Sequence, residues 1–260
     1  MKFDKYEYYS NAVQSCDNDV LFLRKVYKHF YEKAPTVLRE DFCGTFQMCE
    51  EWIKLNKNNT AFGVDLDGEP IEYGKNRMVK NLKPEQQNRI QILRQNVLED
   101  GLPAADINVA MNFSYFIFKQ RQDIKKYFQQ VYKTLKPQGV FVIDTFGGTE
   151  SYESHEEKTK HPKFIYYWDQ INFEPLTNEA RFEIHFHLKG EKRRRKKVFS
   201  YDWRLWSIAE LRDILTEVGF KDITVFWEGT TRKGEGNNDF KPVLKGEECA
   251  SWIAYIACTN

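Results

Sequence analysis

The chain carries two short segments whose residue types and spacing suit the binding of a nucleoside. An apolar run leads into the acidic, glycine-bearing turn of residues 39–46, Arg-Glu-Asp-Phe-Cys-Gly-Thr-Phe. A second apolar run, Phe62-Gly-Val-Asp65, ends in an aspartate about 20 residues after Gly44. A glycine turn lets the backbone approach a ligand closely, and the later acid can accept hydrogen bonds from ribose hydroxyls. The two segments therefore predict a nucleoside pocket at the carboxyl ends of parallel strands.

Three classes of nucleoside cofactor fit such a pocket, and the glycine pattern separates them. The GxxxxGK[ST] loop of mononucleotide sites is absent. The GxGxxG turn of dinucleotide sites is also absent, and a single glycine leaves little room for a pyrophosphate at the helix start. S-adenosylmethionine has no phosphate and needs only one close backbone approach, so the turn favours it. Taken alone, these residues are equally compatible with an ordinary glycine turn and an unrelated downstream acid.

Apolar periodicity predicts the elements that position these segments. Strands are predicted at residues 36–39, 61–64, 90–93, 106–111 and 140–143, and helices at 20–30, 46–55, 69–79 and 123–135. Strands that alternate with helices in this order form a parallel sheet with helices on both faces.

The second half of the chain has a different pattern. Three strand-like runs, 164–171, 181–188 and 197–201, predict an antiparallel sheet. A capping box of Ser207 and Glu210 begins a helix that Gly219 ends. Strands at 223–227 and 252–257 then flank a long polar loop, 228–251.

We therefore predict an α/β fold: a Rossmann-like, doubly wound sheet of about seven strands, with an antiparallel β insertion (the lid) after strand five. The expected parts are an N-terminal helical or lid segment (1–35), a cofactor-binding α/β core (36–150), the lid (151–202), and a return helix with closing strands (203–260).

The order of elements and the motifs resemble class I S-adenosylmethionine-dependent methyltransferases over essentially the whole chain. Residues 40–46 lie where that superfamily has an acid and a glycine-rich turn, and Asp65 lies at its ribose-binding acid. Gln95-Asn-Val97 matches its adenine-contacting segment, and Asn112-Phe-Ser-Tyr115 its methyl-transfer site. The motifs LREDFCGT, NFSY, YDWRLW and SWIAYI resemble a poorly characterised subgroup.

The resemblance implies S-adenosyl-L-methionine as cofactor, and it implies a set of cofactor-binding residues: Glu40, Phe42, Cys43, Gly44, Thr45, Asp65, Leu66, Asn96, Val97, Asn112 and Ser114. Two residues depart from the superfamily pattern. Phe46 replaces the usual last glycine of the turn, where it could crowd the methionyl end of the cofactor. Asn96 replaces the commoner Asp, although its carbonyl can still accept from the adenine amine.

The resemblance also places the acceptor pocket at the ends of strands four and five, under the lid. Tyr8 or Tyr9 is a candidate to close over the cofactor, unless these tyrosines pack a surface helix. The aromatic side chains of the lid either form a cage for an amine or fill the core of the antiparallel sheet. Arg204 either holds a substrate carboxylate or pairs with a neighbouring acid. Candidate catalytic residues are Tyr9, Asn112, Tyr115 and Arg204; candidate substrate or lid residues are Tyr8, Tyr9, Trp168, Tyr201, Trp203, Arg204 and Trp206.

Composition and charge exclude several classes of protein. The formal net charge of +1 lacks the broad basic footprint of nucleic-acid binding, so nucleic acid is not favoured. No apolar run is long enough to span a bilayer, the N-terminus lacks a signal-peptide core, and five scattered cysteines favour reduced thiols, so a cytoplasmic protein without a membrane partner is expected. His185 and His187 share the polar face of their strand; no third ligand is visible in the sequence, so solvated histidines and no metal are expected.

Three functions remain in competition. The first is methylation of a small metabolite, an amine or a carboxylate-bearing compound, in a lid-covered pocket. The second is methylation of RNA or protein, with the basic turn 192–197 as the docking surface. The third is a non-catalytic module of a larger assembly that keeps the fold, and Phe46 is the residue that favours it.

Overall fold

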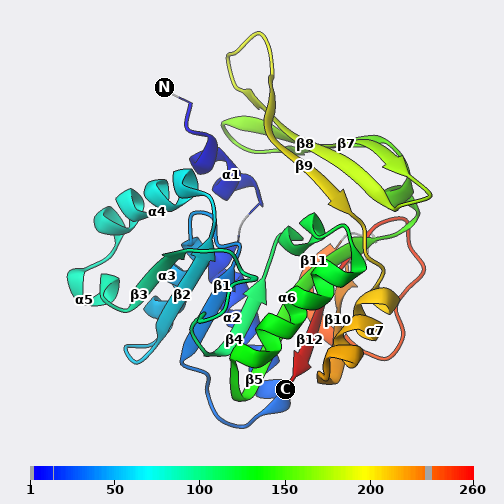
Figure 1. Ribbon diagram of the computed structural model, residues 1–260. Coiled ribbons are helices and arrows are strands. Elements are labelled where there is room, and N and C mark those ends of the chain that lie inside the picture. Colours follow the sequence, from blue (N-terminus) through cyan, green and yellow to red (C-terminus); the bar gives the residue numbers. More distant parts are fainter. Residues whose placement is uncertain (1–2, 14, 232–235) are drawn as a thin grey trace.

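A computed structural model describes residues 3–13, 15–231 and 236–260 (Figure 1). Its helices are α1 (Lys5–Val13), α2 (Cys16–Phe30), α3 (Gln47–Leu55), α4 (Gly68–Asn81), α5 (Pro84–Gln87), α6 (Arg121–Thr134) and α7 (Ile208–Val218), with 3-10 turns η1 (Ser114–Ile117) and η2 (Thr149–Tyr152). Its strands are β1 (Val37–Asp41), β2 (Thr60–Asp65), β3 (Ile90–Arg94), β4 (Ala105–Ala110), β5 (Leu135–Gly147), β6 (His155–Lys160), β7 (Phe164–Glu174), β8 (Glu179–Leu188), β9 (Arg195–Arg204), β10 (Lys221–Thr230), β11 (Gly236–Val243) and β12 (Trp252–Thr259).

The strands form two sheets. The core sheet has eight strands in the order β11-β10-β12-β5-β4-β1-β2-β3, and β5, β4, β1, β2 and β3 run parallel. The lid is a separate antiparallel sheet, β6-β7-β8-β9. Figure 1 shows the lid above the carboxyl edge of the core sheet, with α1 between the two. The predicted α/β architecture is confirmed.

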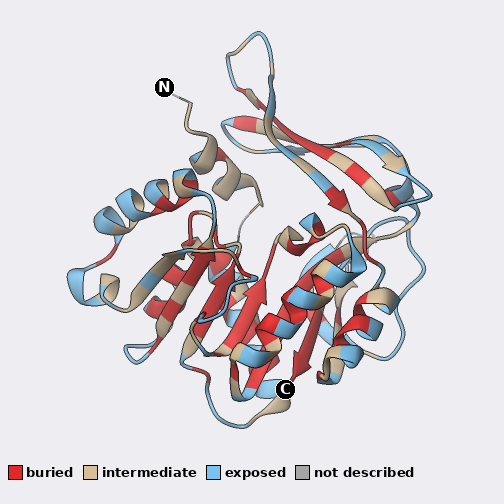
Figure 2. Ribbon diagram, viewed as in Figure 1, coloured by how far each residue is buried: buried red, intermediate tan, exposed pale blue. Residues whose placement is uncertain are grey.

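Helices cover both faces of the core sheet, and each face has its own buried cluster (Figure 2). On one face α6 and α7 pack, with Ile124, Phe128 and Leu211 fully buried. On the other face α2 and α3 pack, and Val20 and Trp52 are fully buried there. Burial on both faces favours apolar residues in the parallel strands, and β5 buries the continuous apolar run from Val140 to Ile143.

Local chain signals set several element boundaries as expected. The Ser207 hydroxyl accepts from the Glu210 backbone N–H, the Glu210 side chain accepts from the Ser207 N–H, and Gly219 ends α7 with a φ of 111°. The Asp67 side chain caps α4 by accepting from the Glu69 N–H at 2.9 Å.

Two predictions about polar segments are wrong. The expected loop 228–251 contains β11, which pairs with β10 and makes the core sheet one strand larger than expected. The lid has a fourth strand, β6, whose sequence is His-Glu-Glu-Lys-Thr-Lys. Both strands lie at sheet edges, where few side chains are buried, so an apolar alternation is not needed to form them. No helix among the described residues is long and apolar enough to cross a membrane.

Candidate functional site

The acidic, glycine-bearing turn follows β1 and is held by the acid at the end of β2. The Gly44 N–H donates to one Asp65 carboxylate oxygen at 2.7 Å, and the Asp67 N–H donates to the other at 2.8 Å. Gly44 has a φ of +51°, and nothing lies within 4 Å of where a Cβ would be. A carboxylate has about four lone-pair sites, so Asp65 keeps acceptor capacity for a ligand. The turn therefore presents open backbone and a carboxylate to the same space.

That space is a cavity of about 480 Å³ between the core, α1 and β9. Its lining includes eight of the predicted cofactor-binding residues: Glu40, Phe42, Cys43, Gly44, Thr45, Asp65, Asn112 and Ser114. The remaining lining residues are Lys5, Tyr6, Tyr9, Asp67, Pro70, Met111, Ile117, Phe199, Tyr201 and Trp203. We call it the core cavity.

Three predicted cofactor residues are not among those lining the core cavity. The Leu66 side chain is exposed, Val97 is packed in the buried cluster under α6, and Asn96 Oδ1 accepts from the Leu98 N–H at 3.0 Å. A contact between these residues and an adenine ring stays a prediction.

Glu40 is a buried acid in the wall of the core cavity. Burial raises the pKa of its carboxyl to about 8, although the Cys49 thiol, which donates to Glu40 at 3.2 Å, acts in the opposite direction. The positive charge of Arg77 also lowers the pKa of Glu40, but the Arg77 guanidinium pairs with Glu50 at 2.9 Å. A cationic ligand group beside Glu40 would gain a strong partner.

A second cavity, of about 210 Å³, lies under the lid. It is lined by Tyr9, Val13, Asn112, Phe113, Phe146, Glu157, Tyr166, Trp168, Ile184, Tyr201, Trp203, Ser251 and Ile253. We call it the lid cavity. The two cavities share Tyr9, Asn112, Tyr201 and Trp203, so these four side chains form a common wall.

The common wall is rigidly supported. The Asn112 and Phe113 N–H groups donate to the Asp144 carboxylate at 2.7 and 2.9 Å, which fixes the chain after β4. Tyr201 and Trp203 stack with ring centroids 4.5 Å apart, and the Tyr9 hydroxyl is hydrogen-bonded to that of Tyr201. Side chains from α1, the core and the lid therefore meet at one point.

Of the other candidate substrate and catalytic residues, Trp168 lines the lid cavity, whereas Tyr8, Tyr115, Arg204 and Trp206 line neither cavity. Tyr8 packs on Phe164 and Phe186 beneath the lid. Tyr115 is fully buried and donates to the Asp144 carbonyl at 2.8 Å, and Trp206 donates to the Phe118 carbonyl at 3.1 Å.

Of the two roles suggested for Arg204, the structure shows the pairing with a neighbouring acid. Arg204 pairs with Glu210 at 3.1 Å, donates to the Lys119 carbonyl, and lies 3.8 Å from the ring centroid of Trp206. Sequence reasoning missed Glu157 and Phe146 as cavity residues because neither lies in a recognisable motif.

Part of the chain matches a known protein family. Residues 41–143 match the family model described as "Methyltransferase domain". Over these residues the chain is similar to methyltransferase domains. S-adenosylmethionine is the cofactor of the class I superfamily that the sequence resembles, and the core cavity offers what this cofactor requires: an open glycine turn, a carboxylate with spare acceptor sites and a buried acid. No curated protein matches the chain.

Solved structures share the methyltransferase fold over nearly the whole chain, at low identity. An S-adenosylmethionine-dependent methyltransferase from Clostridium acetobutylicum has 15% identity and a TM-score of 0.65, covering 96% of both chains. An amino pentose methyltransferase from Micromonospora echinaspora has 12% identity and a TM-score of 0.68, covering 100% of this chain and 98% of the other. A sugar N-methyltransferase from Streptoalloteichus has 11% identity and a TM-score of 0.64, covering 100% and 93%.

Phe46 packs against α4 and does not line the core cavity. Its side chain is fully buried and is not among the residues that line the core cavity. It lies against Gly74 of α4, where an added Cβ would approach the ring to 2.5 Å. Arg77 of α4 also donates to the Thr45 carbonyl at 2.7 Å. The turn is therefore anchored on α4, and Phe46 is part of that anchor.

We expect Phe46→Leu to lower the free energy of unfolding by about 1–2 kcal/mol, because a buried ring is replaced by a smaller side chain. Since Phe46 is absent from the cavity lining, affinity for S-adenosylhomocysteine should change by less than about threefold, which is under 1 kcal/mol. Chemical denaturation and calorimetry measure the two effects. A large loss of affinity with unchanged stability would show that the residue faces the ligand.

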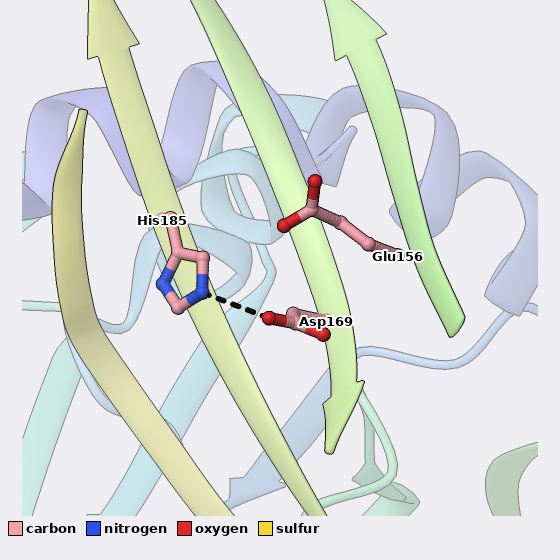
Figure 3. A group of neighbouring side chains, drawn as sticks. All are labelled: Glu156, Asp169 and His185. Carbon is pink, nitrogen blue, oxygen red and sulfur yellow. Dashed lines mark hydrogen bonds and ion pairs between the residues drawn. The ribbon is translucent and has the colours of Figure 1, made fainter. Parts of the chain in front are cut away.

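His185 of the lid is buried rather than solvated, contrary to expectation. His185 is only 2% exposed, and ligand atoms of His185, Asp169 and Glu156 all lie within 4.8 Å of one another (Figure 3). The His185 Nδ1 accepts from the Lys197 N–H at 2.9 Å, and Nε2 lies 3.1 Å from Asp169. Nδ1 is therefore unprotonated, and a neutral ring carries its proton on Nε2. That proton occupies the position on Nε2 that a metal ion would need, so His185 and Asp169 are joined by a hydrogen bond in this arrangement, and Glu156 pairs with Arg194.

The basic turn 192–197 lies at the far end of the lid. Arg194 pairs with Glu156, Arg195 with Glu191, and Lys197 with Glu183. The turn leads into β9, and at about 3.3 Å per residue its last residue, Lys197, is roughly 13 Å from Tyr201 along that strand. The basic turn is therefore separated from the common wall, although Phe199 of the core cavity lies between them.

Proposed function

We propose that this protein is an S-adenosylmethionine-dependent methyltransferase that acts on a small metabolite held under the lid. The observation that carries the proposal is the common wall of the two cavities, formed by Tyr9, Asn112, Tyr201 and Trp203. A cofactor in the core cavity and an acceptor in the lid cavity would be adjacent only across this wall.

The bound cofactor supplies a methyl group attached to a positively charged sulfur. The protein's own residues contribute binding and alignment, which are the main requirements of an in-line displacement. Asp65 would accept from the ribose hydroxyls, and Glu40 would pair with the methionyl ammonium. Asn112, held by Asp144, and Tyr9 would fix the direction of approach between the two cavities.

The similar solved structures support a small acceptor. Two of their titles describe an amino pentose methyltransferase and a sugar N-methyltransferase. The lid cavity, at about 210 Å³, suits a compact group of that size.

The test uses the whole protein with isotopically labelled S-adenosylmethionine and a cell extract. Calorimetry should first show binding of S-adenosylhomocysteine, and the label should then appear in the small-molecule fraction. Binding without transfer to any fraction would favour the non-catalytic module, and label in RNA or protein would contradict a metabolite substrate.

We expect simultaneous charge reversal at Lys192, Arg193 and Lys196, all exposed, to leave methyl transfer within about twofold of wild type. These side chains belong to the basic turn, which lies far from the common wall, and screening weakens exposed charges beyond about 10 Å. Initial rates at physiological ionic strength check this. A tenfold loss would indicate a polyanionic substrate that docks on the turn.

A further inference from the structure

The lid cavity has a charge balance that distinguishes between amine and carboxylate acceptors. The described residues that line it include one carboxylate, Glu157, and no Lys, Arg or His. An anionic substrate would lose hydration there without gaining a cationic partner, which is unfavourable. Lys5, which lines the core cavity, is already paired with Glu69 at 2.7 Å.

A second carboxylate lies beneath the same cavity. Asp144 accepts from the N–H groups of Asn112 and Phe113, both of which line the cavity. Burial raises the pKa of Asp144 to about 7, so it carries partial negative charge at neutral pH. Together with Glu157, it makes the potential in the cavity favour a cation.

Aromatic faces provide the remaining wall. Seven aromatic side chains line the cavity: Tyr9, Phe113, Phe146, Tyr166, Trp168, Tyr201 and Trp203. The Trp168 ring centroid lies 5.9 Å from that of Trp203 and 6.3 Å from that of Tyr201. Ring faces attract a cation through their quadrupole. Burial also raises the pKa of Tyr9 to about 12, so its hydroxyl stays neutral and its oxygen can accept from an ammonium N–H.

Glu157 reaches this cavity because of the strand register. On β6 it lies opposite Trp168, whereas Glu156 lies opposite Asp169. Successive side chains of a strand point to opposite faces, so Glu157 shares the cavity face and Glu156 the outer face. The Glu157 side chain is 58% exposed and lies 3.2 Å from His155 Nε2, which places it at the rim.

We propose that the acceptor is a primary or secondary amine, which enters the lid cavity as a cation between the aromatic faces and Glu157. This inference rests on the proposed methyltransferase function. The ammonium gives one proton to solvent at the rim, and the nitrogen lone pair then forms the bond to the methyl carbon. The carbon–sulfur bond breaks with its electron pair on sulfur, so the products are an N-methylammonium and a neutral thioether.

The test compares three probes with the same ring and different charge: cyclohexylamine, cyclohexanol and cyclohexanecarboxylate. Calorimetry at pH 7.5 should show the amine binding about tenfold more tightly than the alcohol, and the acid most weakly. Glu157→Gln should reduce the preference for the amine about fivefold, whereas Glu156→Gln, the matched control on the opposite face, should leave it unchanged.

The outcomes separate the two levels of the proposal. The amine inference alone is overturned if the wild-type protein binds S-adenosylhomocysteine tightly but binds the alcohol or the acid at least as strongly as the amine. It is also overturned if S-adenosylhomocysteine binds tightly and the amine shows no measurable binding. Failure of the wild-type protein to bind S-adenosylhomocysteine overturns the methyltransferase function itself. Thermal unfolding and S-adenosylhomocysteine affinity of both variants show that their folds are intact.

Discussion

Asp65→Ala should weaken binding of S-adenosylhomocysteine by about 100-fold, which corresponds to roughly 3 kcal/mol. The Asp65 carboxylate accepts from the Gly44 and Asp67 N–H groups, and in the proposed complex it also accepts from ribose hydroxyls. The substitution therefore removes a ligand contact and releases the turn that the ligand approaches. Calorimetry measures the change in affinity.

Two further variants make this expectation specific. Asp65→Asn keeps one carbonyl acceptor and should lie between wild type and Ala. Asp123→Ala, which replaces a half-buried aspartate in the first turn of α6 that lines neither cavity, should bind like wild type. An affinity of Asp65→Ala within threefold of wild type would show that the cofactor does not contact the end of β2.

The affinity for S-adenosylhomocysteine should also fall as pH decreases below 8. Burial raises the pKa of Glu40 to about 8, so the unliganded carboxyl is largely protonated at neutral pH. Pairing with the methionyl ammonium requires the carboxylate, so binding must release a proton. Affinity should therefore fall by up to about tenfold for each pH unit below 8 and level off above it.

Calorimetry from pH 6 to pH 8.5, in two buffers of different ionisation enthalpy, measures both the affinity and the number of protons released. We expect nearly one proton to be released at pH 6.5. Glu40→Gln should weaken binding at pH 8.5 and remove most of the pH dependence, and any dependence that remains belongs to other groups such as Asp144. A flat profile in the wild-type protein would contradict this role for Glu40.

Local chain signals predicted the elements of the core well. The Ser207–Glu210 capping box and Gly219 lie where α7 begins and ends, because helix ends are decided by neighbouring residues. Segments without such signals were missed: β6 and β11 are polar edge strands whose pairing depends on a neighbour far along the chain. The solvated reading of His185 failed for the same reason, since Asp169 and Lys197 come from adjacent strands.

The sequence by itself determined the fold class and the turn of the core cavity. Gly44 follows β1 and Asp65 ends β2, which is the next strand along the chain and runs parallel to β1. Their spacing alone therefore brings them to the same edge of the sheet, where the Gly44 nitrogen lies 2.7 Å from an Asp65 carboxylate oxygen. Only the tertiary structure decided the orientation of Phe46, which is set by packing on Gly74. Only the tertiary structure assembled the lid cavity, because Tyr9, Asn112, Glu157 and Ile253 lie on separate elements. Their meeting depends on how the lid and α1 lie on the core, and no local spacing encodes that arrangement.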